Sequence, residues 1–189
     1  MMTELIFIIL LAVIVLSITT IFLAESLRTT LIFLLILYIC AFFLQIQVWP
    51  IGLAAVNLIT GILIVTVINT YCSTLALTSD SPRNILDILT IVFIGVITFA
   101  FAPQLTAYLA ESSQFLIIGF FLFAIGLLHA GISNHPFRIL LGLLIFSLGF
   151  QILYAPLEGS ALVTALMSMI QIVLAFVVSR LIMQSQEQG

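Results

Sequence analysis

Residues 137–155 read FRILLGLLIFSLGFQILYA, a run of 19 residues whose single charge is Arg138. Pro136 comes directly before this run and Pro156 directly after it. A helix rises about 1.5 Å per residue, so about 20 apolar residues cross the hydrocarbon core of a bilayer, which is about 30 Å thick. The run is continuously apolar rather than alternating, which excludes a barrel strand and indicates a membrane-spanning helix.

Apolar runs of this kind make up most of the chain. Of its 189 residues, 64% are hydrophobic and 6% are charged, whereas about a quarter of the residues in a soluble domain are charged. We therefore predict an all-α polytopic membrane protein, a bundle of seven transmembrane helices that forms one membrane domain. The predicted spans are Leu5–Ala24, Thr30–Val48, Ile51–Leu77, Ile85–Ala102, Phe115–Ser133, Phe137–Ala155 and Ala161–Met183.

The break between the second and third spans, Val48–Ile51, is the least marked. Without a turn there the chain has six spans, but residues 30–77 are far too long for one helix across a bilayer. Trp49 is typical of the aromatic belt at a membrane interface, and Pro50 is typical of a helix start. We therefore place a turn at Trp49-Pro50.

The chain has no lysine, and its four arginines fall on alternate breaks between the spans: Arg28, Arg83, Arg138 and Arg180. An odd number of spans puts all four on one face, which the positive-inside rule makes cytoplasmic. We expect a protein integral to a bacterial or archaeal cytoplasmic membrane, with its N-terminus, Glu111 and Glu158 outside and its C-terminus in the cytoplasm. The lipid bilayer then surrounds the protein. Nucleic-acid binding depends on many cationic side chains, so a chain with only four arginines is expected to have no nucleic-acid partner.

No lysine, arginine, aspartate or glutamate lies at the centre of a predicted span. Charged groups are costly there and are retained only where they have a function. Asp87 is the only acid inside a span, about one turn from its start. We interpret it as a helix-start acid, with an ion or proton entrance as the alternative. His129 lies about one turn from the end of the fifth span. We interpret it as a packing residue, with a role in a proton relay as the alternative.

Motifs for chemistry are missing from the sequence. It has no metal-ligand spacing, no nucleophile–base pair and no haem or nucleotide motif, so we expect no catalytic residue, no cofactor and no metal. Cys40 and Cys72 differ in predicted depth by about 10 Å, which is too far for a disulfide. We expect both to be reduced.

Neutral polar residues remain inside the spans, and most such residues form hydrogen bonds between helices. Ser147 and Gln151 share one face of the sixth span, and Gly142 and Gly149 share nearly the opposite face. We expect the glycine face to pack within the chain and the Ser147/Gln151 face to meet a partner subunit or a hydrated cavity. Gln171 in the seventh span is a further candidate for an ion path or a subunit interface.

A shift of 110 residues superposes Arg28 on Arg138 and three predicted spans on three. Few identities follow, so the sequence allows a three-plus-three architecture without showing one. We divide the chain into a four-helix segment, 1–102, and a C-terminal three-helix unit, 103–189.

The run from His135 to Gly149 resembles the small subunits of the complex I and Mrp antiporter superfamily: the K subunit of NADH:quinone oxidoreductase, the C subunit of Mrp-type Na+/H+ antiporters and component E of hydrogenase-4. The shared pattern is an arginine after the turn, a glycine four residues on, and then a polar residue and a glycine. Here these are Arg138, Gly142, Ser147 and Gly149. Seven spans in a chain of this length are most similar to component E.

This resemblance implies a non-catalytic membrane subunit of a complex I-like, hydrogenase-4-like or Mrp-type complex that translocates protons or sodium. The subunit would bridge larger antiporter-like subunits and would not be an enzyme by itself. K subunits carry glutamates on the proton path, whereas Ser147 stands at one matching position here and no acid lies near Met167 and Ser168 at the other. The alternative function is a self-contained small membrane transporter or channel.

Overall fold

The computed structural model describes residues 2–24, 26–72, 89, 91–98, 100–101, 104, 113–133, 135–157 and 159–187. The helices bounded within these ranges are α1 (Met2–Leu23), α2 (Leu27–Gln45), α3 (Ile51–Cys72), α5 (Ser113–Ile132), α6 (Pro136–Tyr154) and α7 (Ala161–Glu187). Residues 91–98 are also helical. The described part of the chain is therefore all-helical, as its apolar runs predict.

Among the described residues, five helices are long and apolar enough to cross a membrane: Leu27–Gln45, Ile51–Tyr71, Phe115–Ile132, Pro136–Tyr154 and Ala161–Leu181. The apolar stretch Phe7–Leu23 of α1 is shorter. Most of the predicted fourth span, Ile85–Ala102, lies outside the described residues. By length and composition the chain is a helical membrane protein with five candidate spans, and the count of seven stays a prediction.

The turn at Trp49-Pro50 is confirmed, because α2 ends at Gln45 and α3 begins at Ile51. The backbone N–H of Trp49 donates to the carbonyl oxygen of Gln45 at 2.7 Å and tightens the reversal. The indole of Trp49 is only 4% exposed. It therefore packs inside the protein rather than in the lipid-facing belt that its sequence position predicts.

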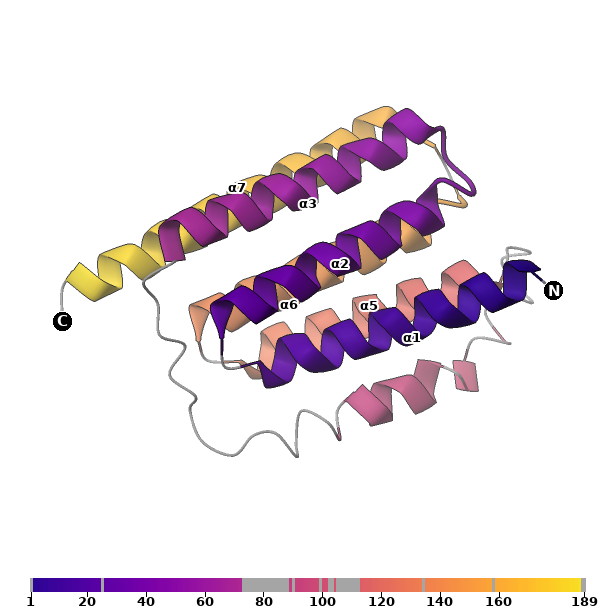
Figure 1. The fold of residues 1–189 in the computed structure, drawn as a ribbon, viewed down its shortest axis with the longest axis horizontal. Coiled ribbons are helices and arrows are strands. Elements are labelled where there is room, and N and C mark those ends of the chain that lie inside the picture. Colours follow the sequence, from indigo (N-terminus) through magenta and orange to yellow (C-terminus); the bar gives the residue numbers. More distant parts are fainter. Residues whose placement is uncertain are drawn as a thin grey trace.

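The six bounded helices form two layers of three, with α1, α2 and α3 in front of α5, α6 and α7 (Figure 1). Neighbours pack within each layer, and α3 contacts α7 and α2 contacts α6 between the layers. The rings of Phe22 in α1 and His129 in α5 stack with their centroids 3.9 Å apart. The described helices thus have the three-plus-three arrangement that the shift of 110 residues allows.

Helix α1 begins and helix α7 ends at opposite ends of the bundle (Figure 1). Arg28 and Arg138 lie in the first turns of α2 and α6, at the end of the bundle where α7 carries Arg180. We call this the arginine end. Three of the four arginines therefore share one face, as predicted, and Arg83 lies outside the described residues.

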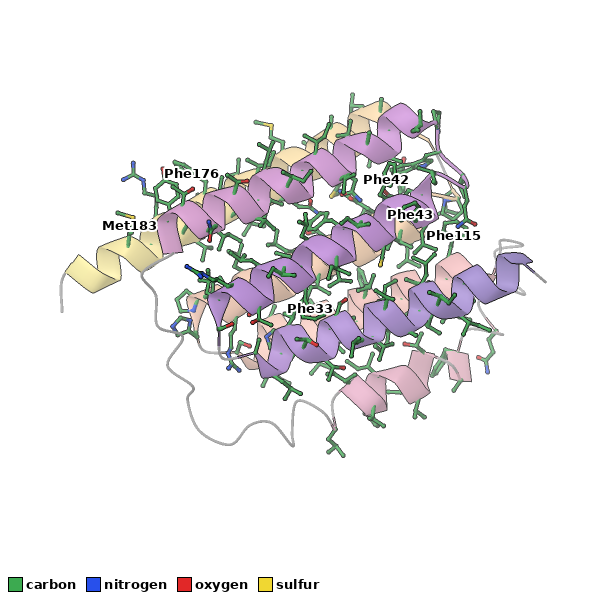
Figure 2. The ribbon with its side chains drawn as sticks, viewed as in Figure 1. Phe33, Phe42, Phe43, Phe115, Phe176 and Met183 are labelled. Carbon is green, nitrogen blue, oxygen red and sulfur yellow. The ribbon has the colours of Figure 1, made fainter. Side chains whose placement is uncertain are left out.

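Burial in α7 is the reverse of that in a soluble helix. Its buried face is made of small and polar residues: Thr164, Ser168, Gln171, Ala175 and Ser179. Its large apolar side chains are exposed instead, among them Leu162, Met169 and Phe176, and Phe176 and Met183 project from the outer edge of the bundle in Figure 2. Such a helix suits an apolar solvent, in which polar groups gain by turning inward.

The glycine face of α6 packs within the chain, as predicted. A Cβ atom added at Gly142 would lie 2.6 Å from the backbone nitrogen of Ala130 in α5, and one at Gly149 would collide with the backbone of Phe123. Gly126 of α5 makes the reciprocal approach to the backbone of Phe146. The backbones of α5 and α6 therefore touch along a seam that admits no side chain.

Gly142→Ala should lower the free energy of unfolding by about 2 kcal/mol or more, because the added methyl meets backbone that yields only if a whole helix shifts. Gly131→Ala in α5 is the control, since a Cβ there has nothing within 4 Å. Thermal unfolding and yield in detergent measure both. Equal stability of the two variants would contradict the close packing of the seam.

A labelling experiment tests the expected orientation. In a variant with both native cysteines replaced by alanine, Gln47→Cys at the end opposite the arginines should react with a membrane-impermeant thiol reagent added outside intact cells. Gly131→Cys at the arginine end should react only after the cells are opened, because arginine-bearing ends resist translocation. The opposite labelling pattern would invert the orientation.

Candidate functional site

Four helices enclose a common interior. Helix α2 contacts α3, α3 contacts α7, α7 contacts α6, and α6 contacts α2, so these contacts close a four-helix ring. Figure 1 shows α2 and α3 in front of α6 and α7. Helices α2 and α7 lie across the ring from one another, and side chains that join them therefore cross its interior.

Tyr38 and Gln171 make such a crossing. The phenol of Tyr38 in α2 donates a hydrogen bond of 3.2 Å to Oε1 of Gln171 in α7, and both side chains are fully buried. The ring of Tyr38 lies directly against Gly61 of α3, where any Cβ would collide with it. A glycine on α3 thus gives the tyrosine the room that it needs to reach α7.

A second pair lies nearer the end opposite the arginines. Nδ2 of Asn57 in α3 donates to Oε1 of Gln45 in α2 at 3.0 Å, and both side chains are fully buried. Gln45 follows Tyr38 by seven residues, which places the two pairs about 10 Å apart along the bundle. Polar side chains therefore occupy about two turns of the interior of the ring.

Gln151 of α6 and Ser168 of α7 are further buried polar residues of these helices. Gln151 is 2% exposed, and neither its amide nitrogen nor its amide oxygen has a hydrogen-bond partner in the part of the chain that the structure describes. The same holds for the hydroxyl of Ser168. Gln151 lies on the side of α6 away from the seam with α5, so it faces the ring.

Trp49 closes the end of the ring opposite the arginines. It belongs to the α2–α3 turn, and a Cβ on Gly159 in the α6–α7 turn would lie 3.8 Å from its Cδ1 atom. The indole therefore sits between the two turns that end the ring. Its Nε1 is buried and has no partner among the described residues.

The structure brings only some of the predicted site residues together. Gln151 and Gln171 belong to the ring, whereas the Ser147 hydroxyl donates at 2.8 Å to the carbonyl oxygen of Leu143 on its own helix. His129 is buried in α5 with its ring stacked on that of Phe22, and its role stays a prediction. Asp87 lies outside the described residues.

Both residues of the Ser147/Gln151 face are buried within the chain's own bundle. This burial favours the predicted hydrated cavity over the predicted contact with a partner subunit, and both stay predictions. Tyr38 and Gln45 were missed. The available signal was their position inside an otherwise apolar span, where a polar group needs a partner.

The chemistry of the ring is neutral hydrogen bonding. Its members are amides, hydroxyls and an indole, which offer both donors and acceptors. Within the described residues, no group of three or more histidine, cysteine or acidic side chains has an arrangement that could hold a metal ion. Comparison of the chain with protein-family models, curated proteins and solved structures finds no match.

Tyr38→Phe should lower the free energy of unfolding by about 1 kcal/mol, because it keeps the ring against Gly61 but leaves the Gln171 oxygen unpaired. Tyr71→Phe is the control, since Tyr71 makes an edge contact with Phe176 through its ring, 5.5 Å between centroids, which phenylalanine preserves. Thermal or chemical unfolding in detergent compares them. Equal losses in the two variants would show that the Tyr38–Gln171 bond contributes nothing.

Proposed function

We propose that this chain is a non-catalytic integral membrane subunit of an ion-translocating complex of the complex I-like, hydrogenase-4-like or Mrp type. It resides in a bacterial or archaeal cytoplasmic membrane and bridges larger antiporter-like subunits. The observation that carries the proposal is the α5–α6–α7 unit. Gly142 and Gly149, on which the resemblance rests, are also the residues on which the packing of α6 against α5 depends.

The outer surface of the bundle supports a bridging role. Both layers expose large apolar side chains along their lengths: Ile32 and Phe43 on α2, Ile59 on α3, Leu127 on α5, and Leu162 and Met169 on α7. Lipid chains or the apolar helices of neighbouring subunits can cover such surfaces equally well, since neither requires a hydrogen bond. The protein therefore offers helix-packing surfaces on two sides.

Ser147 favours a role for the chain as a scaffold over a role as a proton carrier. At the position where K subunits carry a glutamate, this chain has a buried hydroxyl whose hydrogen bond returns to its own helix. Serine does not titrate at physiological pH, so it cannot store a proton as a carboxylate does. The proton or sodium path of the complex then runs through the larger subunits.

A second candidate function is a self-contained transporter or channel for a neutral polar solute. The polar interior of the four-helix ring favours it, because a buried amide such as Gln151, which has no partner among the described residues, is suited to bind a hydrogen-bonding molecule. This candidate predicts activity of the chain on its own.

Purification and reconstitution separate the two candidates. The tagged chain, extracted from its native membrane in mild detergent, should elute with larger membrane proteins at several times its own mass of 20.7 kDa. Deleting it should abolish ion translocation in membrane vesicles, and re-expression should restore it. Liposomes that contain the chain alone should show the same sodium, proton and solute flux as empty liposomes.

A chain that purifies alone and raises solute flux above that of empty liposomes would replace the proposed subunit with a transporter. Normal ion translocation after deletion would also overturn the proposal.

A further inference from the structure

The four-helix ring holds more polar atoms than its own hydrogen bonds use. Within the described residues, these buried atoms have no partner: Trp49 Nε1, Gln45 Nε2, Asn57 Oδ1, Gln151 Nε2, Gln151 Oε1, Ser168 Oγ and Gln171 Nε2. They come from all four helices and from the turn that closes the ring. The Ser147 hydroxyl, by contrast, donates a hydrogen bond to a backbone carbonyl oxygen of its own helix.

Unpaired polar groups are costly in any protein interior and more so in a membrane, where the surrounding lipid supplies no hydrogen bond. Within the part of the chain that the structure describes, the two direct pairs leave each amide half used: Gln45 and Gln171 accept but do not donate, and Asn57 donates but does not accept. Gln151 does neither. A ligand that bridges these groups would remove the cost at several of them together.

The kinds of atoms restrict that ligand. The free groups include amide and indole donors, the acceptors Asn57 Oδ1 and Gln151 Oε1, and the Ser168 hydroxyl, which can act as either. A bound cation would leave the donors unused, and a bound anion would leave the acceptors unused. A small neutral molecule that both donates and accepts suits them all, and water does so with about three hydrogen bonds per molecule.

We propose that the interior of the four-helix ring binds a cluster of water molecules that joins Gln45, Asn57, Gln151, Ser168 and Gln171, and that Trp49 caps this cluster at the end opposite the arginines. The indole lies in the α2–α3 turn at this end of the ring, and its Nε1 is a buried donor without a partner among the described residues. The cluster exchanges with solvent past Trp49. The water cluster goes beyond the proposed function, because it forms whether the chain is a subunit of a complex or acts alone.

Thiol reactivity tests for water inside the ring. In a background with Cys40 and Cys72 replaced by alanine, Ser168→Cys should react with a small, water-soluble methanethiosulfonate at least tenfold faster than two controls. Met169→Cys is at the same depth on the lipid-facing side, and Ala175→Cys is on the same buried face of α7, two turns nearer the arginine end. Only a hydrated thiol ionises and reacts.

A rate for Ser168→Cys that equals the rates of both controls would show a dry interior and overturn the proposal. Trp49→Ala in the Ser168→Cys background should raise the rate several-fold when the reagent is added at the end opposite the arginines. An unchanged rate would overturn the role of Trp49 as a cap.

Gln151→Leu gives a second test that does not depend on reagent access. If water bridges the amides, leucine displaces it, leaves the other amides unpaired and lowers the melting temperature in detergent by several degrees. If the interior is dry, leucine removes an unpaired amide and raises the melting temperature, which overturns the proposal. Gln47→Leu, in the exposed part of the α2–α3 turn, controls for the loss of an amide as such.

Discussion

A bilayer offers no hydrogen bonds, so a polar group in its hydrocarbon core needs a partner inside the protein, while apolar groups can face outward without cost. Helix α7 shows the effect of this constraint. Thr164, Ser168 and Gln171 of α7 turn inward and Leu162 and Met169 turn outward. The same constraint draws Tyr38 of α2 toward Gln171 of α7, and Asn57 of α3 toward Gln45 of α2, because lipid would leave these groups without a hydrogen bond.

The helix boundaries were predictable because nearly every break carries its own signal. Pro136 opens α6, and Pro50 precedes α3. The error at α2 is instructive: its predicted start was Thr30, but the helix begins at Leu27, with the Ser26 hydroxyl accepting a 3.2 Å hydrogen bond from the backbone N–H of Thr29. The sequence predicted Arg28 in the break between two spans, yet a long arginine can extend from a first helical turn toward the interface.

The polar interior was only half predictable. Gln151 and Gln171 stand out in the sequence as amides within apolar spans, and so they became candidates. Tyr38 did not, because its role depends on Gly61 in α3 and on α7 lying across from α2, which are contacts between distant parts of the chain. A single sequence gives the period of each helix but not the neighbours that surround it, and those neighbours decide which polar faces meet.

The two layers have one further property. α1 stands before α5, α2 before α6 and α3 before α7, and each helix runs in the same direction as its counterpart (Figure 1). One layer is therefore related to the other by a displacement and not by a two-fold rotation, which would reverse the order. A two-fold pair presents identical outer faces, but a displaced pair presents its front on one side and its back on the other. The described bundle thus has a polarity within the membrane plane, and neighbours on its two sides meet chemically different surfaces.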